Sequence, residues 1–99
     1  MNVDIKALNF TAADHLEAYI KKKVDKLDHF FENILSAEVH LRAEPVQQVE
    51  NKSVNIKIDL PGANLFAERQ AKTFEAATDL VVDALQVQIK KHKEKIKGI

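Results

Sequence analysis

The chain has 99 residues, of which 45% are hydrophobic and 30% are charged, so it can bury one core, and we expect one domain over residues 1–99. It contains no cysteine, which excludes disulfides and thiolate metal sites and favours a cytoplasmic location. Its apolar runs are short, and Asp4 and Lys6 interrupt the N-terminal segment, which argues against a signal peptide or a membrane span.

The formal net charge of +0 hides an uneven distribution along the chain. Residues 90–97 contain five lysines and one glutamate, a net charge of +4, whereas residues 1–89 contain ten basic and fourteen acidic residues, a net charge of −4. Because binding responds to the local potential rather than to the sum, the C-terminal segment is a candidate surface for a polyanion.

The first two predicted elements are a strand and a long amphipathic helix. Residues 2–8 alternate apolar and polar side chains, which is the period of a half-buried strand. A helix is expected over residues 11–34, with Thr11 and Asp14 as an imperfect capping box at its start. Its apolar stripe has spacings of three and four and consists of Leu16, Ile20, Val24, Leu27 and Phe31.

Three further strands are predicted in the middle of the chain. Residues 36–43 and 53–60 alternate apolar and polar side chains, which is typical of strands with one wet face. The polar segment 44–52 is predicted to be a long hairpin connection between them. A tighter turn at residues 61–64 leads into a weaker fourth strand at residues 65–71.

The last predicted element is a helix capped by Thr73, whose apolar stripe continues through His92 to Ile96. The resulting order is β-α-β-β-β-α. Apolar faces on four strands and two helices are buried together only if both helices pack on one face of a four-stranded sheet, which predicts an α+β fold. The opposite sheet face is left to solvent or a partner and carries His40, Arg42, Asn55, Lys57 and Phe66.

On a helical wheel, the ionisable groups of the first helix lie on two flanks of its apolar stripe. The basic flank contains His15, Lys22, Lys26 and His29, and the acidic flank contains Asp14, Glu17, Asp25, Asp28 and Glu32. Lys23 lies at the edge of the stripe, where its long stem can follow the core. A solvated face with ion pairs of about 0.2–0.5 kcal/mol each is an equally simple explanation, so both interpretations stay open.

The lysines at the end of the second helix exceed what the helix dipole can use, because that effect fades within the last turn. A phosphate backbone would offset their mutual repulsion. A membrane surface is a competing partner, but the segment has too few apolar residues for an interfacial helix. His92 continues the apolar stripe, so packing is a simpler role for it than catalysis.

Nothing in the sequence indicates catalysis. Two glycines cannot supply a phosphate-binding or dinucleotide-binding loop, and the four histidines are spread along the chain without metal-ligand spacing. Ser36 and Ser53 are the only serines, so a nucleophilic site has little to draw on. We therefore expect no enzyme, no metal, no cofactor and no small-molecule substrate.

The element order and four short motifs resemble the ribosome hibernation promoting factor and ribosome-associated inhibitor family, also called sigma-54 modulation proteins. The motifs are KVDKL at residues 23–27, FF at 30–31, AATD at 76–79 and KHKEK at 91–95. The resemblance covers almost the whole chain and depends on the order and spacing of these motifs.

The resemblance implies binding to the small ribosomal subunit, its 16S ribosomal RNA and neighbouring proteins, in the messenger and transfer RNA channel at the A and P sites. Such a protein acts under stress or in stationary phase, blocks translation and preserves idle ribosomes. The family's basic positions correspond here to Lys23, Lys26, Lys91, His92, Lys93 and Lys95. The helical wheel adds Lys22 and Lys90 to this set of RNA-binding candidates.

Two departures from the family pattern affect the prediction. Longer members carry a C-terminal dimerising domain after the position of Ile99, so we expect ribosome pairing to require a second hibernation factor. Short members that oppose ribosome pairing usually carry an extended C-terminal tail, which this sequence lacks. This slightly favours the hibernation-promoting type. Arg69 stands at an inward position of the fourth strand where a small residue is expected, so it must reach outward or find a partner.

Two other functions fit the same sequence. A generic double-stranded RNA-binding module shares the architecture, although the loop and helix-start contacts that cross a groove are not evident. A protein-interaction domain that uses the open sheet face or an edge strand fits the sigma factor label. Binding to a plain RNA duplex would favour the first, and a protein partner recovered without ribosomal RNA the second.

Overall fold

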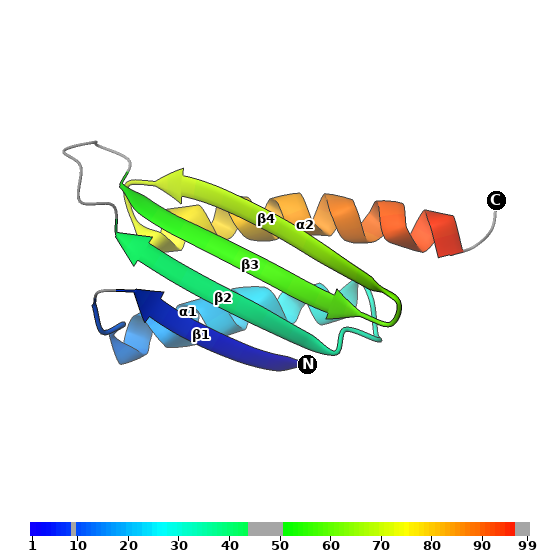
Figure 1. Ribbon diagram of the computed structural model, residues 1–99, viewed down its shortest axis with the longest axis horizontal. Helices are drawn as coiled ribbons and strands as arrows, with labels where there is room; N and C mark the ends of the chain where they lie inside the picture. The colour runs from blue at the N-terminus through cyan, green and yellow to red at the C-terminus, as the bar shows by residue number, and fades with distance from the viewer. Residues whose placement is uncertain (9, 44–50, 97–99) are drawn as a thin grey trace.

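The computed structural model describes residues 1–8, 10–43 and 51–96, without the side chains of residues 95 and 96. Most of the predicted connection at 44–52 therefore lies outside the described residues. The elements are β1 (Asn2–Leu8), α1 (Asp14–Asp25), the 3₁₀ helix η1 (Lys26–His29), β2 (Ser36–Ala43), β3 (Lys52–Leu60), β4 (Ala63–Ala71) and α2 (Phe74–Ile96) (Figure 1). The predicted order β-α-β-β-β-α is confirmed.

The four strands form one mixed sheet in the order β1-β2-β3-β4. β1 runs parallel to β2, so the chain needs a crossover between them, and α1 provides it. β2, β3 and β4 form an antiparallel meander. Gly62, with a φ of 77°, makes the tight turn between β3 and β4. The turn is shorter than predicted because Ala63 and Asn64 already pair with Leu60 and Asp59.

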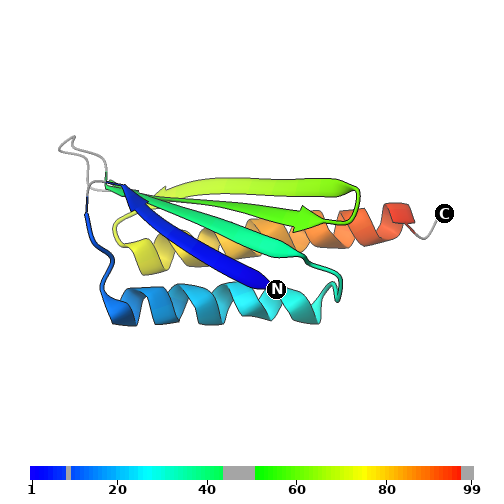
Figure 2. The ribbon, with the colours of Figure 1, turned by 60° about the horizontal axis from the view of Figure 1, so that its bottom comes forward.

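Both helices cover the same face of the sheet, as predicted (Figure 2). The core lies between these two layers, and each fully buried Val, Leu or Ile side chain contributes about 1.5–3 kcal/mol to it. Its largest members with almost no exposed surface are Ile20, Val24, Leu27, Val39, Leu41, Val54, Ile56, Ile58, Val81, Leu85 and Ile89. These residues follow the predicted period of two on the strands and of three and four on the helices.

The start of α1 corrects the predicted capping box. Thr11 lies outside the helix, and the helix begins after Ala13, whose extended backbone and apolar side chain provide no side-chain cap. The Ala13 carbonyl instead accepts the N–H groups of Leu16 at 3.0 Å and Glu17 at 3.1 Å. Phe10, just upstream, stacks on Phe74 with ring centroids 5.0 Å apart, which holds the approach to the helix against the core.

The end of α1 also differs from the predicted helix of residues 11–34. The helix tightens into η1 at Lys26 and ends at His29, a common ending for an α-helix. The chain then turns so that Ile34 enters the core with 5% of its surface exposed. At α2 the prediction is confirmed, because the Thr73 hydroxyl accepts the Ala76 N–H at 3.0 Å.

Arg69 resolves its predicted conflict by reaching outward. It pairs with Val54 across the strands but is exposed, and its guanidinium donates to the Glu68 carbonyl at 2.7 Å. β4 is an edge strand, so a long side chain on its inward side can escape past the edge to solvent.

Candidate nucleic-acid interface

The two helices lie side by side beneath the sheet and run in the same direction (Figures 1 and 2). Their C-terminal halves, which carry the predicted basic residues, therefore point to the same end of the molecule. Contacts along the pair fix this arrangement: Tyr19 of α1 bonds Asp79 of α2, and Phe31 after η1 packs against His92 of α2. Lysines that are more than sixty residues apart in the sequence thus lie on neighbouring helices.

A hollow of ≈ 290 Å³ lies between the helices, and we call it the interhelical groove. It is lined by Lys23, Lys26, Asp79, Val82, Asp83 and Gln86. Two lysines, one from α1 and one from η1, thus share the groove with two aspartates from α2, so the charges within the groove balance. The sequence indicated Lys23 and Lys26 as basic candidates, but it did not place them opposite Asp79 and Asp83, because a helical wheel treats each helix alone.

Lys23 is held by a cluster at this groove. The Tyr19 hydroxyl donates to Asp79, with its oxygen 2.9 Å from Oδ1 and 3.1 Å from Oδ2. Lys23 Nζ lies 3.6 Å from Asp79 Oδ1 and 5.6 Å from the centroid of the Tyr19 ring. Tyr19 and Lys23 are one helical turn apart, which lets both reach the same carboxylate.

The same carboxylate changes the acidity of Tyr19. By accepting a hydrogen bond from the hydroxyl, Asp79 raises the pKa of Tyr19 above its usual range, and partial burial and the charges of Asp79 and Glu75 add to the effect. The protonated phenol is therefore the form that the groove favours.

A second hollow of ≈ 290 Å³ follows η1 and is lined by His29, Phe30, Phe31, Glu32, Asn33 and Lys93. Beside it, the His92 ring packs against Phe31 with centroids 5.6 Å apart and an angle of 54° between the planes. His92 Nε2 is buried and has no hydrogen-bond partner among the described residues. This environment supports the packing role that the apolar stripe predicts for His92.

The remaining predicted basic residues are available to a ligand. They are exposed and form no ion pair with another described residue: Lys22, Lys26, Lys90, Lys91 and Lys93. The Lys95 side chain lies outside the described part of the structure. The structure thus separates the eight candidates into five exposed lysines, one lysine in an ion pair, one packed histidine and one side chain that is not described.

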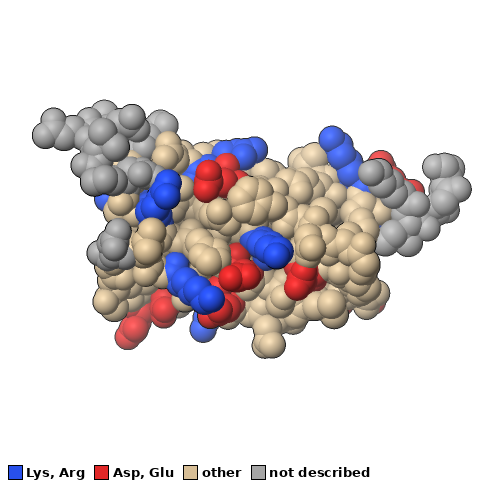
Figure 3. Space-filling model, in the orientation of Figure 1, with Lys and Arg blue, Asp and Glu red and all other residues tan. Residues whose placement is uncertain are grey.

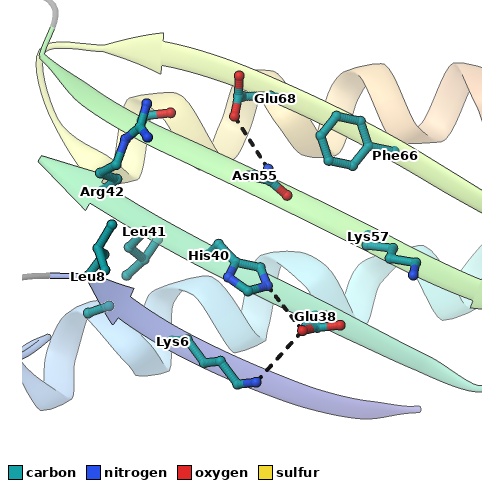
Figure 4. Close-up of a pocket in the computed structure, with 12 residues that line it drawn as sticks. Lys6, Leu8, Glu38, His40, Leu41, Arg42, Asn55, Lys57, Phe66 and Glu68 are labelled. Carbon is teal, nitrogen blue, oxygen red and sulfur yellow. Dashed lines mark hydrogen bonds and ion pairs between the residues drawn. The ribbon is translucent and has the colours of Figure 1, made fainter. Parts of the chain in front are cut away.

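The open sheet face has a different character. A shallow concavity of ≈ 590 Å³ crosses all four strands, and its lining includes the five predicted residues His40, Arg42, Asn55, Lys57 and Phe66 (Figure 4). Acidic and basic side chains alternate over this face (Figure 3). Carboxylates oppose phosphate on this face, whereas the helix pair also carries exposed lysines outside its groove that form no ion pair with a described residue, so the helix pair is the better candidate for RNA.

Several polar groups of the open face are paired with one another. Glu38 Oε1 lies 3.1 Å from His40 Nε2 and 3.8 Å from Lys6 Nζ, and the Asn55 amide donates to Glu68 at 3.3 Å (Figure 4). The hydrogen bond from His40 lowers the pKa of the Glu38 carboxyl, and the charges of His40, Lys6 and Lys57 lower it further.

The described residues contain neither a metal-binding cluster nor a membrane-spanning helix. No three His, Asp or Glu side chains in the described ranges come close enough together to hold a metal ion. Among the helices described here, none is both long and apolar enough to cross a membrane.

The fold and the site define a small α+β protein with a lysine-bearing helix pair on one side of a mixed sheet. The chain belongs to the sigma 54 modulation protein / S30EA ribosomal protein family, whose sequence pattern matches residues 3–97. This confirms the family indicated by the sequence motifs.

Named relatives agree with this assignment. The chain is 30% identical over 95 residues to a ribosome hibernation promoting factor of Azotobacter vinelandii, covering 96% of this chain and 85% of the relative. It has the same identity over 95 residues to a ribosome hibernation promotion factor of Staphylococcus aureus, of which it covers 48%.

Solved structures share the architecture. The N-terminal domain of Thermus thermophilus Protein Y superposes with a TM-score of 0.79 at 29% identity, covering 93% of this chain and 99% of that domain. A ribosomal subunit interface protein from Coxiella burnetii superposes with a TM-score of 0.83 over 95% of this chain and 99% of its own, and at 18% identity it supports the fold alone.

Proposed function

We propose that this protein is a cytoplasmic ribosome hibernation factor that binds the small ribosomal subunit in the channel for messenger RNA and for A-site and P-site transfer RNA. Bound there under stress or in stationary phase, it blocks translation and preserves idle ribosomes. Membership of the family and the names of the relatives support the ribosome as partner. The proposal includes no catalytic step, cofactor or small-molecule substrate.

The observation that carries the proposal is the set of exposed lysines on the helix pair. Lys22 and Lys26 from the first helical segment and Lys90, Lys91 and Lys93 from α2 lie on parallel helices with no ion pair to a described residue. Such ammonium groups gain most from phosphate, because each neutralised phosphate releases condensed counterions. Lys95 belongs to the proposed contacts through its place in the closing motif.

Lys23 and His92 have indirect roles in this proposal. Lys23 is occupied by Asp79 in the free protein, and its contact with RNA requires a change in that ion pair. His92 supports the lysines on either side of it by packing against Phe31. A packed ring at this position holds the last turns of α2 against the segment after η1.

Binding to purified small subunits, measured at several salt concentrations, tests the proposal. We expect steep salt dependence and competition with messenger RNA and P-site transfer RNA. The double charge reversal Lys26→Glu and Lys93→Glu should weaken binding at least about tenfold and reduce the salt slope by about 2. The matched control is the double variant Lys57→Glu and Lys72→Glu, which makes the same charge change away from the proposed lysines. It should reduce binding much less.

Binding that is insensitive to salt, or equal loss in both double variants, would contradict the proposed surface. Tight binding to a plain RNA duplex, with no preference for the subunit, would instead favour a generic duplex-binding module. Sucrose-gradient fractionation of stationary-phase extract would show whether the protein travels with small subunits, whole ribosomes or paired ribosomes, and thereby whether a second hibernation factor acts with it.

A further inference from the structure

We propose that Asp79 is an internal competitor for phosphate, whose carboxylate occupies the place beside the Lys23 ammonium that an RNA phosphate takes when the helix pair binds. This inference rests on the proposed function, because it assumes that the helix pair meets a phosphate backbone. Asp79 is negatively charged, so no basic motif reveals it. It nevertheless helps to determine where phosphate can bind on the helix pair.

The geometry of the Lys23–Asp79 pair allows exchange with a ligand. The Nζ–Oδ1 distance is 3.6 Å, and the side chains are 29% and 45% exposed, so the pair lies at the mouth of the interhelical groove. Partly exposed ion pairs are weak because solvent screens them. A phosphate that is also held by neighbouring lysines can therefore replace the carboxylate at Lys23.

Tyr19 makes this exchange possible without leaving a charge unsatisfied. Its hydroxyl bonds both carboxylate oxygens of Asp79, at 2.9 and 3.1 Å, from the side of α1. When the long Lys23 side chain turns toward a ligand, Asp79 keeps this charge-assisted hydrogen bond. The carboxylate is anchored, and the lysine is the partner that moves.

Simultaneous binding of Asp79 and a phosphate to Lys23 is unfavourable. Two anions on one ammonium repel each other at a distance of a few ångströms, and partial desolvation of the groove strengthens that repulsion. Asp79 therefore weakens phosphate binding at the Lys23 end of the surface, while Lys90, Lys91 and Lys93 stay available at the other end. The acidic residue limits the RNA footprint on this side.

The chain provides a matched control for this role. Asp83 lines the same groove one helical turn later but forms no ion pair or hydrogen bond with another described residue. Asp79→Asn and Asp83→Asn remove the same charge from the same groove, and only the first removes the competitor at Lys23. Asp79→Asn also keeps an oxygen acceptor for Tyr19, so the cluster can still form.

The test measures Kd for purified small subunits and for a single-stranded oligouridylate over a salt series. Asp79→Asn should bind both ligands several-fold more tightly than the wild type, with a salt slope steeper by about 0.7–0.9, the value for one more neutralised phosphate. Asp83→Asn should leave the slope unchanged, and Asp79→Glu should stay near the wild type. In a Lys23→Ala background, Asp79→Asn should not change the slope.

Weaker binding by Asp79→Asn, or equal effects of Asp79→Asn and Asp83→Asn, would overturn the inference. Binding to oligouridylate but not to subunits would refute the proposed function, and the variants measured on oligouridylate would still decide the inference. If neither ligand binds the wild type, both fail. If a variant does not fold, NMR on the wild type tests the inference instead. The Lys23 ammonium resonance should shift on saturation with oligouridylate. An unchanged resonance would overturn the inference.

Discussion

The His92 ring packs against the Phe31 ring across the helix pair, with centroids 5.6 Å apart, and its Nε2 atom is buried without a hydrogen-bond partner among the described residues. A histidine placed between lysines in the sequence is thus directed inward. Proximity to basic residues in a motif does not decide whether a side chain contacts a ligand, because successive helical residues point in different directions.

The packing role predicts how His92 responds to substitution. His92→Phe keeps an aromatic ring against Phe31 and removes a buried, unpartnered nitrogen, so stability should be unchanged or higher. His92→Ala loses the ring contact and should lower the free energy of unfolding by about 1–3 kcal/mol. Urea denaturation measures both changes.

Binding by the same variant distinguishes packing from direct contact. His92→Phe should bind small subunits within about twofold of the wild type, a difference well below 1.4 kcal/mol. Lys93→Ala is the comparison, since it removes an exposed ammonium from the next position. If His92→Phe loses as much affinity as Lys93→Ala, the imidazole contacts RNA.

The two threonines that precede the helices should differ in their effect on stability. Thr73→Ala removes the hydroxyl that accepts the Ala76 N–H at 3.0 Å and should cost about 0.5–2 kcal/mol. Thr11→Ala removes no cap, since α1 begins after Ala13, and should stay within about 0.5 kcal/mol of the wild type. Thermal or urea unfolding of the two variants provides the measurement; equal losses would mean that Thr11 caps α1 in solution.

The strands and the inner helix stripes could be predicted because they follow a simple period. Alternation with a period of two placed residues such as Val39 and Ile56 on the buried face, and the helical stripe placed Ile20 and Leu85 there. Cap positions could not be assigned with the same success, since capping depends on the direction from which the chain enters the helix.

The site was less predictable than the fold. The lysines could be found from their number and spacing, but the bond between Tyr19 and Asp79 joins residues 60 positions apart. This bond depends on the register in which the two parallel helices lie. A wheel of one helix carries no information about that register. The same register determines that Lys23 is held in an ion pair while Lys26 is exposed.

The open sheet face should contain a carboxyl group with a lowered pKa. The hydrogen bond from His40 to Glu38 lowers the Glu38 pKa, so removing the ring with His40→Ala should raise that pKa toward its ordinary value. Lys6→Ala should raise the Glu38 pKa less, because Lys6 acts only through its charge, with Nζ 3.8 Å from the carboxylate. Carbon-13 NMR titration of the Glu38 carboxyl measures both shifts, and a larger effect of Lys6→Ala would contradict the assigned cause.

Tyr19 is the only tyrosine in the chain, so tyrosinate absorbance reports this one side chain. Its pKa should lie above the usual value of about 10, because the Asp79 carboxylate accepts a hydrogen bond from its protonated hydroxyl. Asp79→Asn should bring the pKa down toward that value, whereas Asp83→Asn should leave it nearly unchanged. A tyrosine that titrates at its ordinary value in the wild type would show that the bond to Asp79 does not persist in solution.

The raised pKa also links Tyr19 to stability at alkaline pH. The folded state favours the protonated phenol, so the stabilisation is complete below the unfolded pKa of about 10 and is lost as pH rises through the higher folded pKa. Above that point, the phenolate can no longer donate to Asp79 and repels it. Tyr19→Phe has no phenolic proton to lose. The Tm of the wild type should therefore fall relative to the Tm of the variant as pH rises through that range. Lysines titrate in both chains, so this difference isolates the Tyr19–Asp79 bond, and a constant difference across alkaline pH would contradict it.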